Sequence, residues 1–178
     1  MSGPGARSYA AAVSVSPRDI ITPSAEDAAA VGGIIYRASE AAYTDIVPAG
    51  FLWTLEENVA SCQRLLGNPT AIVLAAVSGN EWLGISAVLM PDAGSGDAEL
   101  QRLYVMPERW GEGIGNLLHD AALRSAQRAG ATAASLWVME KNNRARAFYE
   151  HRGWQLTAGA DEHGGVVEVQ YERALGVI

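Results

Sequence analysis

Apolar residues recur at helical spacing in several stretches of this chain, and the clearest covers residues 113–129. Its apolar side chains fall on one face, and Gly130 follows where the helix should end. A second amphipathic pattern covers residues 53–67 and ends at Gly67. The two patterns predict two helices that each bury one side. The apolar face of the first consists of Ile114, Leu117, Leu118, Ala121 and Ala122.

Capping residues predict two more helices. Ser24, with Asp27 three residues later, has the pattern of a capping box and begins a helix that should run to about residue 42. Gly32 and Gly33 weaken this prediction, because each glycine costs about 1 kcal/mol relative to alanine inside a helix. Asn142 is the expected N-cap of a short helix that ends before Gly153.

Apolar runs bounded by turn residues predict the strands. One strand includes Ile20 and Ile21, and two more lie within residues 70–90, joined by a tight turn at residues 78–80. Further strands are expected at residues 98–107, 133–140, 154–159 and 166–175, with loops at residues 91–97 and 161–165.

The order of these elements predicts an α+β fold, or α/β with mixed pairing, in one domain from residue 18 to residue 178. The strand, helix and strand between residues 98 and 140 predict a crossover between parallel strands. Residues 1–17 have too weak an apolar stretch for a secretory signal and are expected to form a disordered leader.

Composition narrows the class of protein. A chain of 178 residues, 49% of them hydrophobic, is long enough for one globular core. No apolar run approaches the roughly 20 residues of a membrane-spanning helix. The single cysteine, Cys62, cannot form an internal disulfide, which fits a reduced, cytoplasmic setting. The formal charge of −7 argues against a general nucleic-acid binder and suits a cationic partner, although acidity also serves solubility.

Three glycines, Gly111, Gly113 and Gly115, stand at alternate positions between the strand at 98–107 and the helix at 113–129. The first turn of a helix leaves N–H groups without intrahelical partners, and glycine lets a ligand approach them closely. The loop is therefore a candidate phosphate site, or else simply a tight turn. It lacks the Gly-Lys-Ser/Thr of a P-loop, and its spacing differs from the dinucleotide fingerprint.

The segment from Glu99 to Trp154 resembles the GNAT superfamily of acetyl-coenzyme A dependent N-acetyltransferases. That family has a strand, a Gln/Arg-x-x-Gly-x-Gly/Ala loop and a helix, then a second strand, an Asn and a helix with Phe-Tyr before Gly-Phe. The corresponding residues here are 110–115, Asn142, Phe148-Tyr149 and Gly153-Trp154, in matching order and spacing. The resemblance implies a GNAT-like domain with a mixed, mostly antiparallel sheet flanked by helices.

The resemblance also implies acetyl-coenzyme A as cosubstrate and no metal. Backbone amides from Gly111 to Asn116 would bind its pyrophosphate, and main-chain groups of Leu103 to Val105 would pair with its pantetheine arm in a gap between splayed strands. Asn142 would contact the pantetheine region or act only as an N-cap. The expected coenzyme-binding residues are Leu103, Tyr104, Val105, Trp110, Gly111, Glu112, Gly113, Ile114, Gly115, Asn116 and Asn142.

Two positions in the loop depart from the family pattern. Trp110 occupies the first place, where Gln or Arg is usual, and Glu112 brings a negative charge where many relatives carry a basic residue. A cradle made of backbone does not depend on these side chains. Coenzyme affinity could still be weaker, or Arg109 could turn inward to compensate.

Acetyl transfer requires a neutral amine, a donor for the developing oxyanion and a proton or hydrogen bond for the leaving thiolate. Tyr149 is the candidate for the last task through its place in the Phe-Tyr motif. A phenol with an ordinary pKa of about 10 would mainly donate a hydrogen bond, because a thiol has a pKa near 8.5. Glu99 is the candidate base, expected to share a strand face with Gln101, Leu103 and Val105. A water chain or a backbone carbonyl is the alternative, and the resemblance offers the Val105 amide as oxyanion donor.

Other polar residues have simpler interpretations. His119, in the middle of a helix, is expected at the surface or rim of the fold, and Cys62 is expected to pack as a small hydrophobe. Contiguous Asp, Glu and His at residues 161–163 are weak evidence for a metal site. Arg144 and Arg146 are expected on a solvated helix face, although one of them could reach a coenzyme phosphate.

The predicted function is transfer of an acetyl group from acetyl-coenzyme A directly to a primary amine of a small molecule. A protein acetyltransferase for an N-terminus or lysine, and a coenzyme-binding module without activity, are the alternatives. A homodimer is left open. In the family the N-terminal helices help to build the acceptor pocket, here residues 25–67, and residues 161–171 could lie across the same opening. Its candidate side chains are Glu40, Tyr43, Asp45, Phe51 and Trp53.

Overall fold

The structure, a computed structural model, describes residues 18–91 and 97–176. The leader expected at residues 1–17 lies outside these ranges, as does most of the loop expected at residues 91–97. No helix among the described residues is long and apolar enough to cross a membrane.

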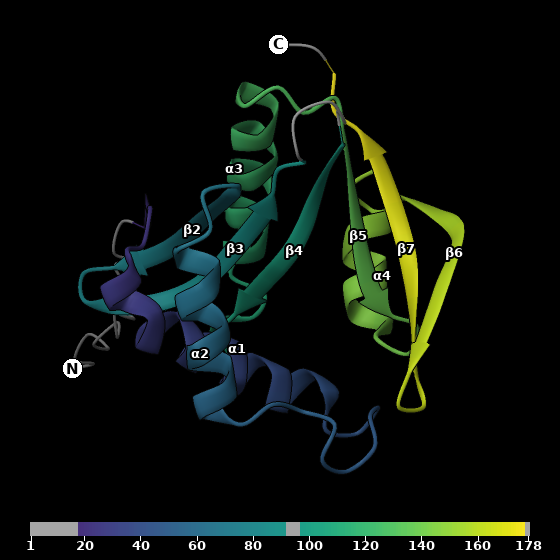
Figure 1. Cartoon of the computed structure of the whole chain (residues 1–178), viewed down its shortest axis with the longest axis horizontal. Helices are drawn as coiled ribbons and strands as arrows, with labels where there is room; N and C mark the ends of the chain where they lie inside the picture. Colours follow the sequence, from purple (N-terminus) through teal and green to yellow (C-terminus); the bar gives the residue numbers. More distant parts are fainter. Residues whose placement is uncertain (1–17, 92–96, 177–178) are drawn as a thin grey trace, which may run out of the picture.

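A seven-stranded sheet in the order β1-β2-β3-β4-β5-β7-β6 forms the centre of the fold (Figure 1). All neighbouring strands pair antiparallel except β4 and β5, which pair parallel and are joined through helix α3, as the sequence predicts. The strands are β1 Asp19–Ile21, β2 Ala71–Ser78, β3 Glu81–Leu89, β4 Asp97–Val105, β5 Ala133–Met139, β6 Gln155–His163 and β7 Val166–Ala174.

Helices cover both faces of the sheet. Ile85 and Ala87 of β3 lie in apolar clusters with helices α1 and α2, whereas Val88, on the opposite face, lies in a cluster with helix α3. This alternation is what a strand buried on both faces requires. The α-helices are α1 Ala28–Tyr43, α2 Leu55–Leu66, α3 Ile114–Arg128 and α4 Asn143–Glu150, and 3-10 turns occupy Ala25–Asp27 and Pro107–Arg109.

The hairpin of β6 and β7 corrects one prediction. Residues 161–165 were expected to form a loop, but β6 continues to His163, which pairs with Val166. Only Gly164 and Gly165 form the turn, with φ values of +57° and +80°, as a tight hairpin requires. Polar residues can occupy this end of β6 because it is an exposed edge strand with its side chains in solvent.

The two glycines inside α1 have different surroundings. A Cβ added to Gly32 would lie 2.8 Å from the Cα and 2.9 Å from the N of Val59 in α2, too close for any rotamer change to relieve. A Cβ added to Gly33 would meet nothing within 4 Å. Gly32 therefore permits close packing of α1 on α2, whereas Gly33 only weakens the helix.

Gly32→Ala should lower the free energy of unfolding by roughly 1–3 kcal/mol, because a backbone clash separates α1 from α2. Gly33→Ala, the matched control one residue away, should raise it by roughly 0.5–1 kcal/mol through helix propensity. Urea unfolding of both variants measures these changes. A stabilised Gly32→Ala variant would show that α1 and α2 do not pack in this way.

Candidate active site

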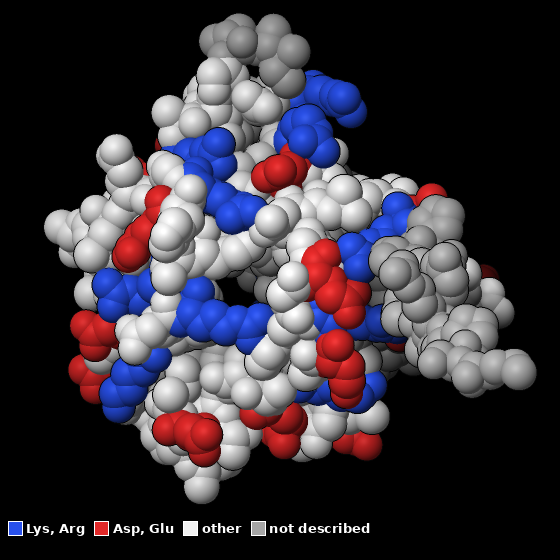
Figure 2. All heavy atoms as spheres, turned by 180° about the vertical axis from the view of Figure 1, so that it is seen from behind, with Lys and Arg blue, Asp and Glu red and all other residues white. Residues whose placement is uncertain are grey.

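A cleft opens where β4 and β5 separate. The two strands pair only from Asp97 to Glu99 and from Ala133 to Ser135, and beyond these residues their facing edges diverge (Figure 1). The cleft between them has a volume of about 830 Å³, which suits a cofactor-sized ligand. Seen from behind, the molecule is hollowed near its centre, and Lys and Arg side chains lie along the hollow (Figure 2).

Nearly all the predicted site residues meet at this cleft. Glu112 is the exception, since it does not line the cleft. The predicted residues that line it are Glu99, Leu103, Tyr104, Val105, Trp110, Gly111, Gly113, Ile114, Gly115, Asn116, Asn142 and Tyr149.

A β-bulge in β4 corrects the expected position of Glu99. Arg102 pairs with Ala87 and Leu100 with Val88, so Gln101 is an extra residue without its own partner on β3. The bulge reverses the alternation of side chains. Glu99 therefore shares a face with Arg102 and not with Leu103 or Val105, which pack on the opposite side toward α3.

The glycine loop turns directly into α3. Gly111 and Gly113 have φ values of +84° and +82°, a left-handed conformation in which other residues are strained. Gly113 is the N-cap of α3, so the N–H groups of Ile114, Gly115 and Asn116 point out of its first turn without intrahelical partners. Together with the helix dipole, these groups form an anion-binding position at one end of the cleft.

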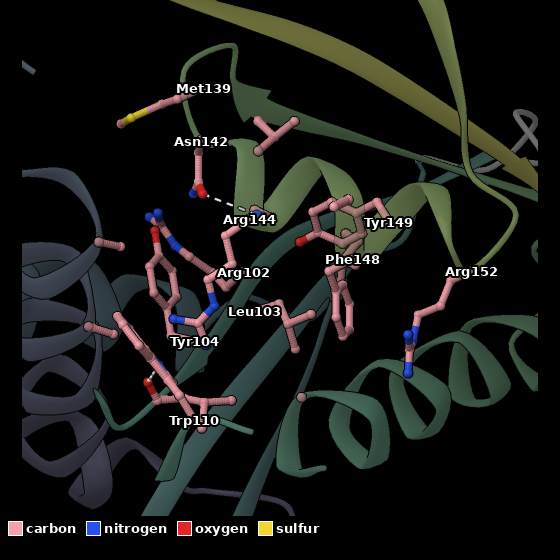
Figure 3. Close-up of a pocket in the computed structure, with 18 of the residues that line it drawn as sticks. Arg102, Leu103, Tyr104, Trp110, Met139, Asn142, Arg144, Phe148, Tyr149 and Arg152 are labelled. Atoms are coloured by element: carbon pink, nitrogen blue, oxygen red, sulfur yellow. Dashed lines mark hydrogen bonds between the residues drawn. The ribbon is translucent and has the colours of Figure 1, made fainter. Parts of the chain in front are cut away.

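Trp110 connects this loop to both sides of the cleft. Its Nε1–H donates a hydrogen bond to the carbonyl of Val105 at 2.8 Å. The guanidinium of Arg144, at the start of α4, lies 3.7 Å from the centre of the Trp110 ring (Figure 3). Burial lowers the pKa of Arg144. The aromatic residue at the first place of the motif thus holds an arginine from another element beside the loop.

The negative charge of Glu112 is paired with two arginines. Its carboxylate lies 2.6 Å from Arg18 and 3.6 Å from Arg109. Arg109 also forms an ion pair with Glu81 at 2.7 Å, and the hydrogen bond and charge of Glu81 raise the pKa of Arg109. Arg109 therefore lines the cleft with its charge already paired by two carboxylates, and Glu112 is less repulsive to an anion than its charge suggests.

Tyr149 is held by aromatic rings, with its hydroxyl free to act in the cleft. It is 9% exposed and makes edge-to-face contacts with Phe148 at 5.3 Å and Trp154 at 5.8 Å between ring centroids. Its hydroxyl points into the space between α4 and β4 (Figure 3). Burial, with a smaller effect of Tyr104, raises the pKa of Tyr149 well above its usual value. Tyr149 is thus a neutral hydrogen-bond donor near pH 7.

His119 corrects another prediction, because it is completely buried and not at the surface or rim. Its Nε2 accepts a hydrogen bond from Trp154 Nε1 at 3.0 Å, and its Nδ1 lies 2.8 Å from Asp120 Oδ1. A neutral ring with the proton on Nδ1 satisfies both contacts. Burial lowers the pKa of His119, with Asp120 acting in the opposite direction. His119 therefore supports Trp154, which in turn packs on Tyr149.

The remaining predictions have mixed outcomes. Asn142 caps α4 by accepting a hydrogen bond from the Ala145 N–H at 3.1 Å, and it also lines the cleft. Cys62 is buried among apolar side chains, as predicted. Arg146 is not simply solvated, because its Nε–H donates to the hydroxyl of Tyr171 at 3.0 Å. Within the described residues, no group of three or more His, Cys, Asp or Glu side chains could hold a metal ion.

The residues that line the acceptor side of the cleft differ from those expected from the sequence. Of the five side chains expected in the acceptor pocket, Tyr43 alone lines the cleft. Arg152 and Glu168 also line it, and the Arg152 guanidinium lies 4.2 Å from the centre of the Phe148 ring. Arg152 Nε is buried without a hydrogen-bond partner among the described groups. Glu168 lies within residues 161–171, which were expected across the opening, but it was not singled out there.

The chain belongs to the acetyltransferase (GNAT) family, whose model matches residues 34–154, more than half of the chain. Its sequence is 36% identical over 89 residues to a mycothiol acetyltransferase of Beutenbergia cavernae, covering 50% of this chain and 28% of that one. It is 47% identical over 51 residues to an uncharacterized N-acetyltransferase of Archaeoglobus fulgidus, covering 29% and 35%. The chain thus spans about a third or less of the length of these relatives.

Solved structures share the fold. The PaiA N-acetyltransferase of Thermoplasma acidophilum, solved with coenzyme A, superposes with a TM-score of 0.71 at 20% identity, over 88% of this chain and 99% of that one. The acetyltransferase YncA of Salmonella typhimurium, described as putative and solved with acetyl-coenzyme A, has a TM-score of 0.64 at 18% identity, over 89% and 94%. The predicted single GNAT-like domain is confirmed.

The buried His119 should make stability depend on pH. The unfolded chain takes up a proton near the usual pKa of about 6.5, whereas the folded chain does so only at lower pH. Between these two pKa values the unfolded state binds more protons than the folded state. The free energy of unfolding therefore increases with pH in this range, by up to about 1.4 kcal/mol per pH unit, and the protein becomes less stable on acidification.

Unfolding by urea at pH 5.0, 6.0 and 7.5 checks this slope. His119→Gln, whose amide oxygen can still accept from Trp154, should lose most of it. His151→Gln, which changes an exposed ring at the end of α4, should keep it. An unchanged slope in His119→Gln would assign the acid sensitivity to other groups.

Proposed function

We propose that this protein transfers an acetyl group from acetyl-coenzyme A to a primary amine of a small molecule. The observation that carries the proposal is the cleft itself, in which an anion-binding helix start and the hydroxyl of Tyr149 face the gap between β4 and β5. Family membership supports acyl transfer, and the name of the Beutenbergia cavernae relative supports a small-molecule acceptor.

The cleft fits the chemistry of the cosubstrate. Its diphosphate would meet the free N–H groups from Gly113 to Asn116, where no side chain blocks the approach at the glycines. Arg144 and Arg152 line the same cleft and supply positive charge for its phosphates. The unpaired edge of β4 supplies main-chain groups for the pantetheine arm.

The chain's own residues would act on the acyl group at the gap. Tyr149 would donate a hydrogen bond to the sulfur as the C–S bond breaks, since its hydroxyl stays protonated. The Val105 amide would be the oxyanion donor, because its strand ends at the glycine loop. The cytoplasmic location and a homodimer stay predictions.

A panel of amines tests the activity, with release of free thiol from acetyl-coenzyme A as the readout. Turnover of amino acids, polyamines or amino sugars supports the proposal. Turnover of peptides alone would make this a protein acetyltransferase, and binding of coenzyme A without any turnover would make it a binding module.

Gly113→Asp should abolish coenzyme binding, because the substitution strains a residue at φ +82° and places a carboxylate where the diphosphate would lie. Gly130→Asp is the matched control, since Gly130 also has a positive φ but lies at the other end of α3, away from the cleft. Calorimetric titration with coenzyme A measures both. Equal affinity in the two variants would remove the loop from the binding site.

Tyr149→Phe should lower kcat by about 100-fold and leave the Kd for coenzyme A within about threefold, because it removes only the donor to the sulfur. Tyr36→Phe, which removes a hydroxyl from α1 outside the cleft, should keep normal kcat. Thiol release with the best amine gives kcat, and calorimetry gives Kd. Full turnover in Tyr149→Phe would exclude the tyrosine from the reaction.

A further inference from the structure

Three carboxylates line the cleft: Glu99 on β4, Asp161 on β6 and Glu168 on β7. Acetyl transfer needs one group that accepts a proton from the acceptor nitrogen. That group must lie close to Tyr149, since the nitrogen attacks the carbon that is leaving the sulfur. Position along the strands separates the three candidates.

The strand register places Glu99 and Glu168 at opposite ends of the gap. Glu99 pairs with Ser135, at the closed end where β4 and β5 still share hydrogen bonds. Glu168 pairs with Met139, four residues further along β5, where the strands have separated. At roughly 3.3 Å per residue, the two positions differ by about 13 Å along β5. Met139 and Asn142 border this open end, across from Tyr104 and Trp110 (Figure 3).

Three tyrosines gather with Glu168 at the open end. Tyr43, the last residue of α1, lines the cleft with Tyr104 and Tyr149. The pKa of Tyr43 is raised by burial first, then by the charge and hydrogen bond of Tyr104, and further by Tyr149 and Glu168. The charge of Glu168 and the hydroxyl of Tyr149 both act on the Tyr43 phenol, which agrees with the strand register in placing Glu168 at the open end of the cleft.

A competing partner separates Asp161 from the other two carboxylates of the cleft. Asp161 Oδ2 lies 2.8 Å from His163 Nε2. Glu168 makes no ion pair with any other residue in the described part of the chain, and its cross-strand neighbour is the like-charged Asp161. Two carboxylates opposite each other are unfavourable unless a cation or proton lies between them. The Tyr149 side chain, nine-tenths buried, likewise points its hydroxyl into the cleft without a hydrogen bond to a described group.

Given acetyl transfer as the proposed function, we propose that Glu168, not Glu99, binds the amino group of the acceptor and accepts its proton. The acceptor enters from the α1 side, with its nitrogen between Glu168 and Tyr149. The carboxylate pair of Glu168 and Asp161 selects acceptors that carry positive charge in solution, and this fits amines better than alcohols or thiols.

The proton balance of the step is simple. The ammonium form of the acceptor first loses one proton to water, and the neutral nitrogen then forms a bond to the carbonyl carbon of the thioester while the carbon–sulfur bond breaks with its electron pair on sulfur. The nitrogen gives one proton to Glu168. Tyr149 keeps its own proton and donates a hydrogen bond to the leaving sulfur, which takes one proton from water, while Glu168 returns its proton to water. The products are the amide and the free thiol.

Glu168→Gln should lower kcat/KM for the best amine by at least about 100-fold and leave the Kd for coenzyme A unchanged. Glu172→Gln is the matched control, because Glu172 lies on the same strand, is exposed and does not line the cleft. In Glu168→Ala, added formate should restore part of the turnover, whereas chloride at equal ionic strength should not. A purely structural role would not give this rescue.

Full kcat/KM in Glu168→Gln, or loss of activity in Glu99→Gln alone, would overturn this assignment and leave acetyl transfer standing. A large loss in Glu168→Gln without formate rescue in Glu168→Ala would also overturn it, in favour of a structural role. If the wild-type protein binds coenzyme A but acetylates no amine, the proposed function itself fails and Glu168 loses its role with it.

Discussion

β4 and β5 stop sharing hydrogen bonds after Glu99 and Ser135, and the rest of the site depends on this separation. Backbone groups along a strand edge need partners, so an open edge inside a sheet is stable only where water or a ligand supplies them. Here the β-bulge at Gln101 twists β4 away, and β5 remains supported by β7 alone. The gap therefore costs hydrogen bonds that a pantetheine arm can replace.

The walls of the gap differ in chemistry. On the α3 and α4 side, helix-start N–H groups and the arginines Arg144 and Arg152 favour an anion. On the α1 side, tyrosine hydroxyls and the Glu168 carboxylate supply hydrogen-bonding groups and negative charge. The two substrates of an acetyl transfer have these opposite charges, and the gap between the strands is where they can meet.

The aromatic side chains behind α4 give the site its rigidity. His119, Phe148, Tyr149 and Trp154 are in edge-to-face contact, and the histidine is held neutral by burial. A buried ring with few alternative rotamers keeps the Tyr149 hydroxyl in one position. Near the loop, Arg144 stacks on Trp110 and so joins α4 to the glycine turn. The tryptophan at the place where Gln or Arg is usual in the family therefore has a structural role.

The sequence by itself determined the local features: the helix caps at Ser24 and Asn142, the glycines that need a positive φ, and the family motif that contains Tyr149. These depend on residues close together in the chain, where spacing and residue type are sufficient. Only the tertiary structure decided that His119 is buried, that Glu99 lies at the closed end of the gap, and that Glu168 lies at its open end. The reason is that one extra residue in β4 reverses the side-chain alternation, and hydrophobic pattern alone does not reveal which residue bulges or which strands pair.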